Sequence, residues 1–128
     1  MGIQKSGWLL IALFFFCGVA GVALFKKNKN TNISVSETKD EITVMAQFPD
    51  GKSKRVQDQL RTQLNLTDLP DLTHVEVKRY QTPDRHMRFY IKSKPGYVKL
   101  RMDKDENNID AQAKMKQTGK IIGEALAE

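Results

Sequence analysis

The chain opens with a run of apolar residues that differs from everything after it. Residues 7–25, GWLLIALFFFCGVAGVALF, contain no charge. As a helix the run would extend about 28 Å, close to the roughly 30 Å hydrocarbon core of a membrane. It is also longer than the apolar core of a cleaved signal peptide. The pattern therefore predicts a single-pass transmembrane helix that is retained as a signal anchor.

The residues around this run divide the chain further. We predict an N-terminal tail over residues 1–6, a polar tether over residues 26–37 and a folded domain over residues 38–128. Lys5 precedes the run, whereas Lys26, Lys27 and Lys29 follow it, which favours a cytoplasmic domain. A short N-terminal tail that stays inside is the commoner design and points the other way, so the orientation stays open.

Periodicity within residues 38–128 predicts a small α+β domain. The six predicted elements are a strand at 41–48, a helix at 52–66, strands at 74–80, 86–92 and 97–102, and a helix at 109–127. Helical spacing places Met115, Ile122 and Leu126 on the core side of the last helix. The order β-α-β-β-β-α predicts a two-layer sandwich, in which an antiparallel meander carries both helices on its apolar face.

The residues that alternate with the apolar positions of the last three strands lie on the opposite face of the predicted sheet. Between residues 78 and 101 the chain has eight basic residues and one acidic residue, Asp84. We predict a surface that binds anions or an acidic partner. The alternative is an ordinary solvated face. The predicted binding residues are Lys78, Tyr80, Arg88, Tyr90, Lys92, Tyr97, Lys99 and Arg101.

The register of the first hairpin follows from its apolar residues, which must share one face. The pairing that we predict places Lys78 opposite Arg88 and Tyr80 opposite His86. The first of these pairs brings two like charges together, which destabilises a sheet.

The second hairpin is expected to turn at Pro95-Gly96. A two-residue turn at this point sets Lys92 opposite Lys99 and Tyr90 opposite Arg101. A wider loop is the alternative, because a type II turn matches the twist of a hairpin poorly.

Nothing in the composition or in the candidate motifs argues for an enzyme. The 128 residues include 21 Lys+Arg and 15 Asp+Glu, a net charge of +6. The single cysteine, Cys17, excludes an internal disulfide and a cysteine-based zinc site. The two histidines, His74 and His86, are predicted to lie too far apart to share a metal. We therefore predict no catalytic residue, no metal and no cofactor.

We interpret the chain as a non-enzymatic membrane-anchored interaction module, part of a membrane-associated assembly. Its partner would be an acidic protein surface or anionic lipid. The alternative is binding of single-stranded nucleic acid or RNA, because aromatic rings between basic residues can stack on bases. Two pairs of small residues, Cys17 with Gly21 and Gly119 with Gly123, are candidates for helix–helix contacts. For the second pair, close packing on the sheet is the alternative.

Overall fold

The computed structural model describes residues 13–16, 20–28, 31–69 and 71–127 and has a small α+β fold, as the sequence predicts. From residue 41 onward the element order is the predicted β-α-β-β-β-α. Strand β3 comes directly before this series and gives the antiparallel sheet its fifth strand, to which two earlier strands are added. The bounds are β3 Thr31–Thr38, β4 Glu41–Gln47, α1 Ser53–Leu64, β5 Val75–Gln81, β6 Arg88–Lys94, β7 Tyr97–Asp103 and α2 Ile109–Ala127.

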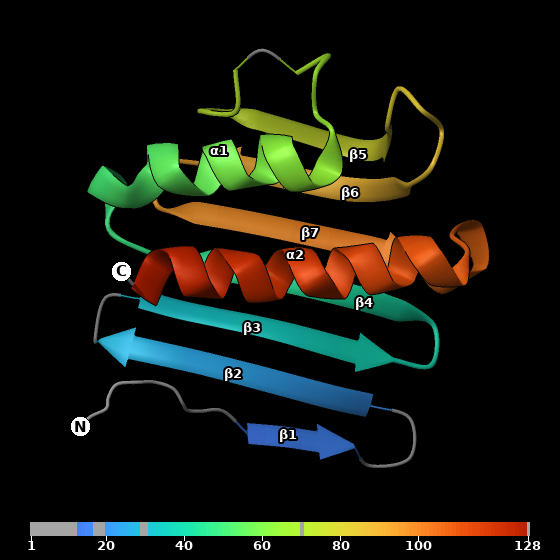
Figure 1. Ribbon diagram of the computed structural model, residues 1–128, viewed down its shortest axis with the longest axis horizontal. Coiled ribbons are helices and arrows are strands. Elements are labelled where there is room, and N and C mark those ends of the chain that lie inside the picture. Colours follow the sequence, from blue (N-terminus) through green and yellow to red (C-terminus); the bar gives the residue numbers. More distant parts are fainter. Residues whose placement is uncertain (1–12, 17–19, 29–30, 70, 128) are drawn as a thin grey trace.

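The strands form one antiparallel sheet in the order β1-β2-β3-β4-β7-β6-β5, where β1 is Leu13–Phe16 and β2 is Ala20–Asn28. Both helices lie on the same side of this sheet (Figure 1), and α2 packs on β3 and β4. The opposite face of β5, β6 and β7 is therefore left without a covering element among the described residues.

The apolar run at residues 7–25 differs from the predicted transmembrane helix where the structure describes it. Residues 13–16 and 20–25 lie in strands, and β2 pairs with β3. Residues 7–12 and 17–19, like the predicted tail, lie outside the described residues. Among the helices of the described ranges, none combines the length and the apolar character that crossing a bilayer requires. A transmembrane helix is therefore not shown.

Residues 31–37 lie in strand β3, where the sequence predicts part of a tether. This strand pairs with β4 from Asn32 to Glu37. Ile33 is only 2% exposed, and Val35 packs against the same core. Ser34 and Ser36, which alternate with them, take the outward positions of the strand. Side chains of α2 and of the segment after β7 hold the strand from the inner side, because Lys116 and Lys104 both form ion pairs with Glu37.

The core between sheet and helices contains the residues that the periodicity selects. Ile42, Val44 and Ala46 of β4 are buried, as are Met115, Ile122 and Leu126 of α2. The start of α2 is capped by Asn108, whose Oδ1 accepts a hydrogen bond of 2.8 Å from the backbone N–H of Ala111. This bond satisfies one of the free amide groups of the first turn.

Gly119 brings α2 close to the sheet. A Cβ at this position would lie 2.5 Å from Val35 Cγ2 and 3.2 Å from Val44 Cγ2. Only a residue without a side chain allows this approach. Close packing within the chain thus accounts for Gly119. Gly123 is also buried, whereas Cys17 lies outside the described residues.

The second hairpin has the predicted register. Tyr90 lies opposite Arg101 and Lys92 opposite Lys99, and the strands turn at Pro95-Gly96. Gly96 has φ +76°, a conformation that favours glycine. A Cβ here would also come within 2.8 Å of the Phe48 carbonyl oxygen, so the turn has no room for a larger residue.

The first hairpin differs from the prediction. Val77 pairs with Ile91 and Tyr80 pairs with Phe89, so two residues of β5 face the single residue Tyr90. This β-bulge shifts the register by one and turns Tyr80 onto the core face, where it is 5% exposed. The predicted pairs Lys78–Arg88 and Tyr80–His86 are wrong.

The partners in the corrected register follow from the bulge. Arg88 pairs with Gln81, and His86 precedes β6. The ring of Tyr80 packs on Phe89, with 5.5 Å between centroids, and its hydroxyl donates a hydrogen bond to Asp68. Burial, together with the Asp68 carboxylate, raises the pKa of Tyr80. Tyr80 therefore lies in the core and not on the outer face of the sheet, where the sequence predicted it.

Candidate functional site

The outer side of β5, β6 and β7 forms a continuous basic surface, which we call the basic face. The acidic residues of these strands are Glu76 and Asp103. The basic residues are Lys78, Arg79, Arg88, Lys92, Lys94, Lys99 and Arg101. None of the nine is buried, and the excess of positive charge makes this face attractive to anions.

Tyr90 lies at the middle of the basic face. Its hydroxyl donates a 2.7 Å hydrogen bond to Glu76 Oε2, and the guanidinium of Arg101 lies 5.0 Å from its ring centroid. The hydrogen bond raises the pKa of Tyr90 and lowers the pKa of Glu76, since it stabilises the protonated phenol beside a charged carboxylate. Glu76, Tyr90 and Arg101 are thus connected across the three strands by a hydrogen bond and a cation–π contact.

A second tyrosine of the basic face is arranged in the same way. The ammonium group of Lys94 lies 5.4 Å from the ring centroid of Tyr97, and the two residues are paired across the hairpin turn. Cations over aromatic faces are favourable contacts of about 0.5–1 kcal/mol at exposed sites. The rings of Tyr90 and Tyr97 therefore act as supports that orient positive charge.

Lys92 and Lys99 form a directly opposed pair of like charges. On its other side Lys92 pairs with Glu76, whereas Lys99 pairs with the uncharged Met45. Across the part of the chain that the structure describes, neither lysine forms an ion pair. Lys99 is therefore the position at which the repulsion has no compensation.

Replacing Lys99 by glutamate is expected to stabilise the fold by about 0.2–1 kcal/mol, because the new carboxylate would face Lys92 across the strands. The control is Lys94→Glu, which makes the same change of charge opposite Tyr97 and should give no such gain. The free energy of unfolding of the full chain, measured by urea titration, tests this. Equal effects of the two changes would contradict the opposed-pair explanation.

Arg79 belongs to the basic face although the alternation pattern did not select it. The bulge turns its side chain outward, where it forms a 2.9 Å ion pair with Glu106. A signal was present in the sequence, since Val75 and Val77 predict a core position at residue 79, and arginine is a poor core residue. This break in the alternation marks the bulge.

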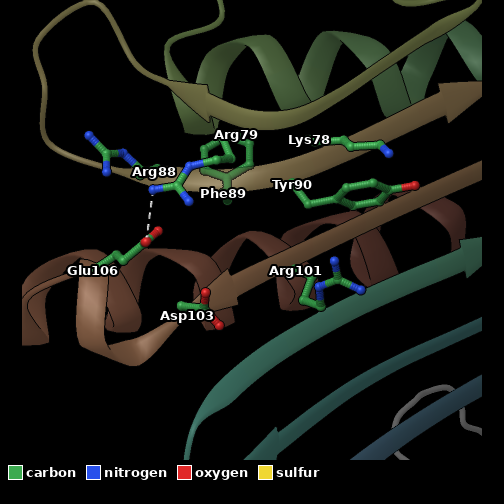
Figure 2. A pocket seen from close by; sticks show the side chains of 8 residues that line it. All are labelled: Lys78, Arg79, Arg88, Phe89, Tyr90, Arg101, Asp103 and Glu106. Atoms are coloured by element: carbon green, nitrogen blue, oxygen red, sulfur yellow. Dashed lines mark hydrogen bonds and ion pairs between the residues drawn. The ribbon is translucent and has the colours of Figure 1, made fainter.

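A small pocket of about 60 Å³ opens on the basic face between the bulge and the end of β7 (Figure 2). Three arginines and one lysine line it from three strands, and in Figure 2 Lys78 and Arg101 extend to one side while Arg88 extends to the other. Its lining residues are Lys78, Arg79, Arg88, Phe89, Tyr90, Arg101, Asp103 and Glu106. The Arg79–Glu106 ion pair closes one side of the pocket.

The 3-10 turn Lys104–Glu106, which supplies one wall of this pocket, is fixed by Asn107. The side-chain Nδ2 of Asn107 donates 2.8 Å hydrogen bonds to the carbonyl oxygens of Arg88 and Asp103, and its Oδ1 accepts a 2.8 Å bond from the Arg88 N–H. Asn107 is buried and links the start of β6 with the end of β7. The pocket therefore has a rigid support.

The two histidines and Asp84 are the other residues that the sequence analysis singled out. His74 and His86 are both exposed. Asp84 accepts hydrogen bonds from the Thr82 hydroxyl and the His86 N–H, and the hydroxyl in particular lowers the pKa of Asp84. In the ranges described, no three His, Cys, Asp or Glu side chains are grouped to hold a metal ion.

No protein-family model matches the chain, and no curated protein or solved structure matches it either. The function is therefore inferred from the chemistry of the basic face.

Proposed function

We propose that the protein is a non-enzymatic interaction module, held at a membrane by residues 7–25, whose basic face binds an acidic protein partner. One observation supports this most strongly: Lys99 faces Lys92 and has no acid on its other side, on a face with seven basic and two acidic residues. Like charges opposed on a sheet oppose folding. An acidic partner would turn the same repulsion into attraction.

The arrangement of the tyrosines favours a protein over a nucleic acid. Base stacking needs open aromatic rings. Arg101 lies over the ring of Tyr90, Lys94 lies over that of Tyr97, and Tyr80 is in the core. The face therefore offers ordered cations rather than stacking surfaces, which suits carboxylates and other compact anions.

The membrane anchor is the second part of the proposal. It takes residues 7–25 as a helix, an alternative to strands β1 and β2, on the strength of their length and lack of charge. A reporter fused to the C-terminus, active on one side of a membrane only, tests both insertion and orientation. The flanking lysines favour a cytoplasmic domain. Recovery of the full chain in the soluble fraction would contradict the anchor.

The partner can be sought with a photo-crosslinking residue that leaves every cation in place. Gln47 suits this purpose, since it is exposed on the outer side of β4 opposite Tyr97. The matched control is Gln117, which is exposed on α2 in the helical layer. In native membranes we expect an acidic protein to be crosslinked from position 47 and not from position 117.

Charge reversal provides the second arm of this experiment. Lys99→Glu combined with Arg101→Glu should abolish the crosslink from position 47, while the fold is retained. Crosslinks that survive this double change, or that form equally from position 117, would contradict the proposal. Crosslinks that disappear on nuclease treatment would contradict it as well and would favour nucleic-acid binding.

A further inference from the structure

We infer that the pocket on the basic face is a binding site for a phosphate monoester, presented by a phosphorylated side chain of the partner. The inference rests on the proposed function, because the partner supplies the phosphate. It goes further by naming the group that is recognised and the side chains that recognise it.

Residues with hydrogen-bond donors line the pocket from three strands. Lys78 and Arg79 come from the bulge of β5, Arg88 from β6 and Arg101 from β7, and Figure 2 shows Lys78 and Arg88 extending to opposite sides of the pocket. Three of these four cations are arginines, whose planar guanidinium groups present N–H donors in the fork that fits the oxygens of phosphate. The bulge is essential to this set, because it places two consecutive basic residues beside Tyr90.

The contacts of these cations with other residues leave N–H donors available. Arg79 uses Nη2 for Glu106, Arg88 makes a long 3.4 Å bond to Gln81, and Arg101 lies over the Tyr90 ring. Within the described residues Lys78 forms no ion pair. Guanidinium groups have five N–H donors each, so most donors remain for a ligand.

Charge and size both favour a phosphate over a carboxylate. Four cations and two carboxylates line the pocket and leave a formal charge of +2. A phosphorylated side chain has a charge of about −1.5 to −2 at pH 7 and three acceptor oxygens. The volume of about 60 Å³ corresponds to several water-sized spheres, enough for one tetrahedral oxyanion. A single carboxylate would neutralise only half of the charge.

The test measures binding of three peptides to the full chain in detergent micelles. The peptides have one acidic sequence and differ at a central position, which is phosphoserine, glutamate or serine. Inorganic phosphate serves as a competitor and shows whether the free ion occupies the same pocket. We expect the phosphoserine peptide to bind at least about tenfold more tightly than the glutamate peptide.

Variants with the same loss of charge separate the pocket from the rest of the face. Lys78→Gln and Arg101→Gln should remove most of the preference for phosphoserine. Lys94→Gln and Lys99→Gln lie outside the pocket and should weaken all three peptides alike. Thermal unfolding of each variant verifies the fold, and Lys78, which is exposed, gives a second test if Arg101→Gln fails to fold.

The outcomes distinguish this inference from the proposed function. A phosphoserine preference that is lost in the pocket variants alone supports it. Equal binding of the phosphoserine and glutamate peptides would overturn the phosphate site and leave the acidic-partner proposal standing. Equal loss of preference in the pocket and control variants would overturn it too. Failure of all three peptides to bind would count against both.

Discussion

Asn107→Ala is expected to destabilise the fold by about 2–4 kcal/mol. The substitution removes three hydrogen bonds and leaves the backbone N–H and carbonyl of Arg88 and the carbonyl of Asp103 without their partner. Unsatisfied polar groups that are partly buried cost about 1–3 kcal/mol each, and water can reach some of them. The same change should also loosen the 3-10 turn Lys104–Glu106 and weaken ligand binding in the pocket.

The neighbouring residue provides a matched control for this prediction. Asn108 caps α2 through a single hydrogen bond, so Asn108→Ala should cost only about 1 kcal/mol. Urea unfolding of the full chain and both variants measures the difference. If Asn107→Ala costs no more than Asn108→Ala, the linking role of Asn107 is wrong.

Gly119→Ala is expected to destabilise the fold by about 1–3 kcal/mol, although alanine is the better helix former. The new methyl group would lie 2.5 Å from Val35 Cγ2, so α2 or β3 would have to move. Gly51→Ala is the control, since a Cβ at Gly51 meets no atom within 4 Å. That substitution should be neutral or slightly stabilising.

A second substitution tests the cause of this loss. Val35→Ala removes the nearest methyl group, so in that background the cost of Gly119→Ala should fall, and only the 3.2 Å approach to Val44 Cγ2 remains to oppose the new methyl group. A cost that is unchanged in the Val35→Ala background would show that contact with Val35 is not the reason.

The register of the second hairpin was predictable because the residues of its turn determine it. Pro95 and Gly96 specify a two-residue turn, and the turn fixes every pair up to Tyr90 with Arg101. The first hairpin has a longer connection, so its register depends on packing instead. Arg79 at an expected core position was the one local sign that the alternation fails at the bulge.

The sequence contains only weak evidence for strand β3. Ile33 and Val35 alternate with serines, but the flanking residues are polar and match a tether equally well. What makes this segment a strand is tertiary: backbone pairing with β4 and the ion pairs of Glu37 with Lys104 and Lys116. Propensity alone cannot show such contacts.

The pocket likewise depends on tertiary contacts that the sequence pattern does not show. Lys78, Arg88 and Arg101 are visible as basic residues in the sequence, whereas their place around one pocket depends on the bulge and on the turn held by Asn107. Alternation therefore predicts the basic face, and tertiary packing creates the hollow within it.

The central claim is that the basic face, rather than the net charge of the chain, binds an acidic partner. The most direct measurement is the affinity of the full chain for an acidic peptide at two salt concentrations. One variant changes Lys92, Lys99 and Arg101 to glutamine, and its matched control changes the exposed Lys39, Lys54 and Lys120. We predict a loss of at least about tenfold and a weaker salt dependence for the first variant only. Equal losses in both variants, or tighter binding of a single-stranded oligonucleotide than of the peptide, would contradict the claim.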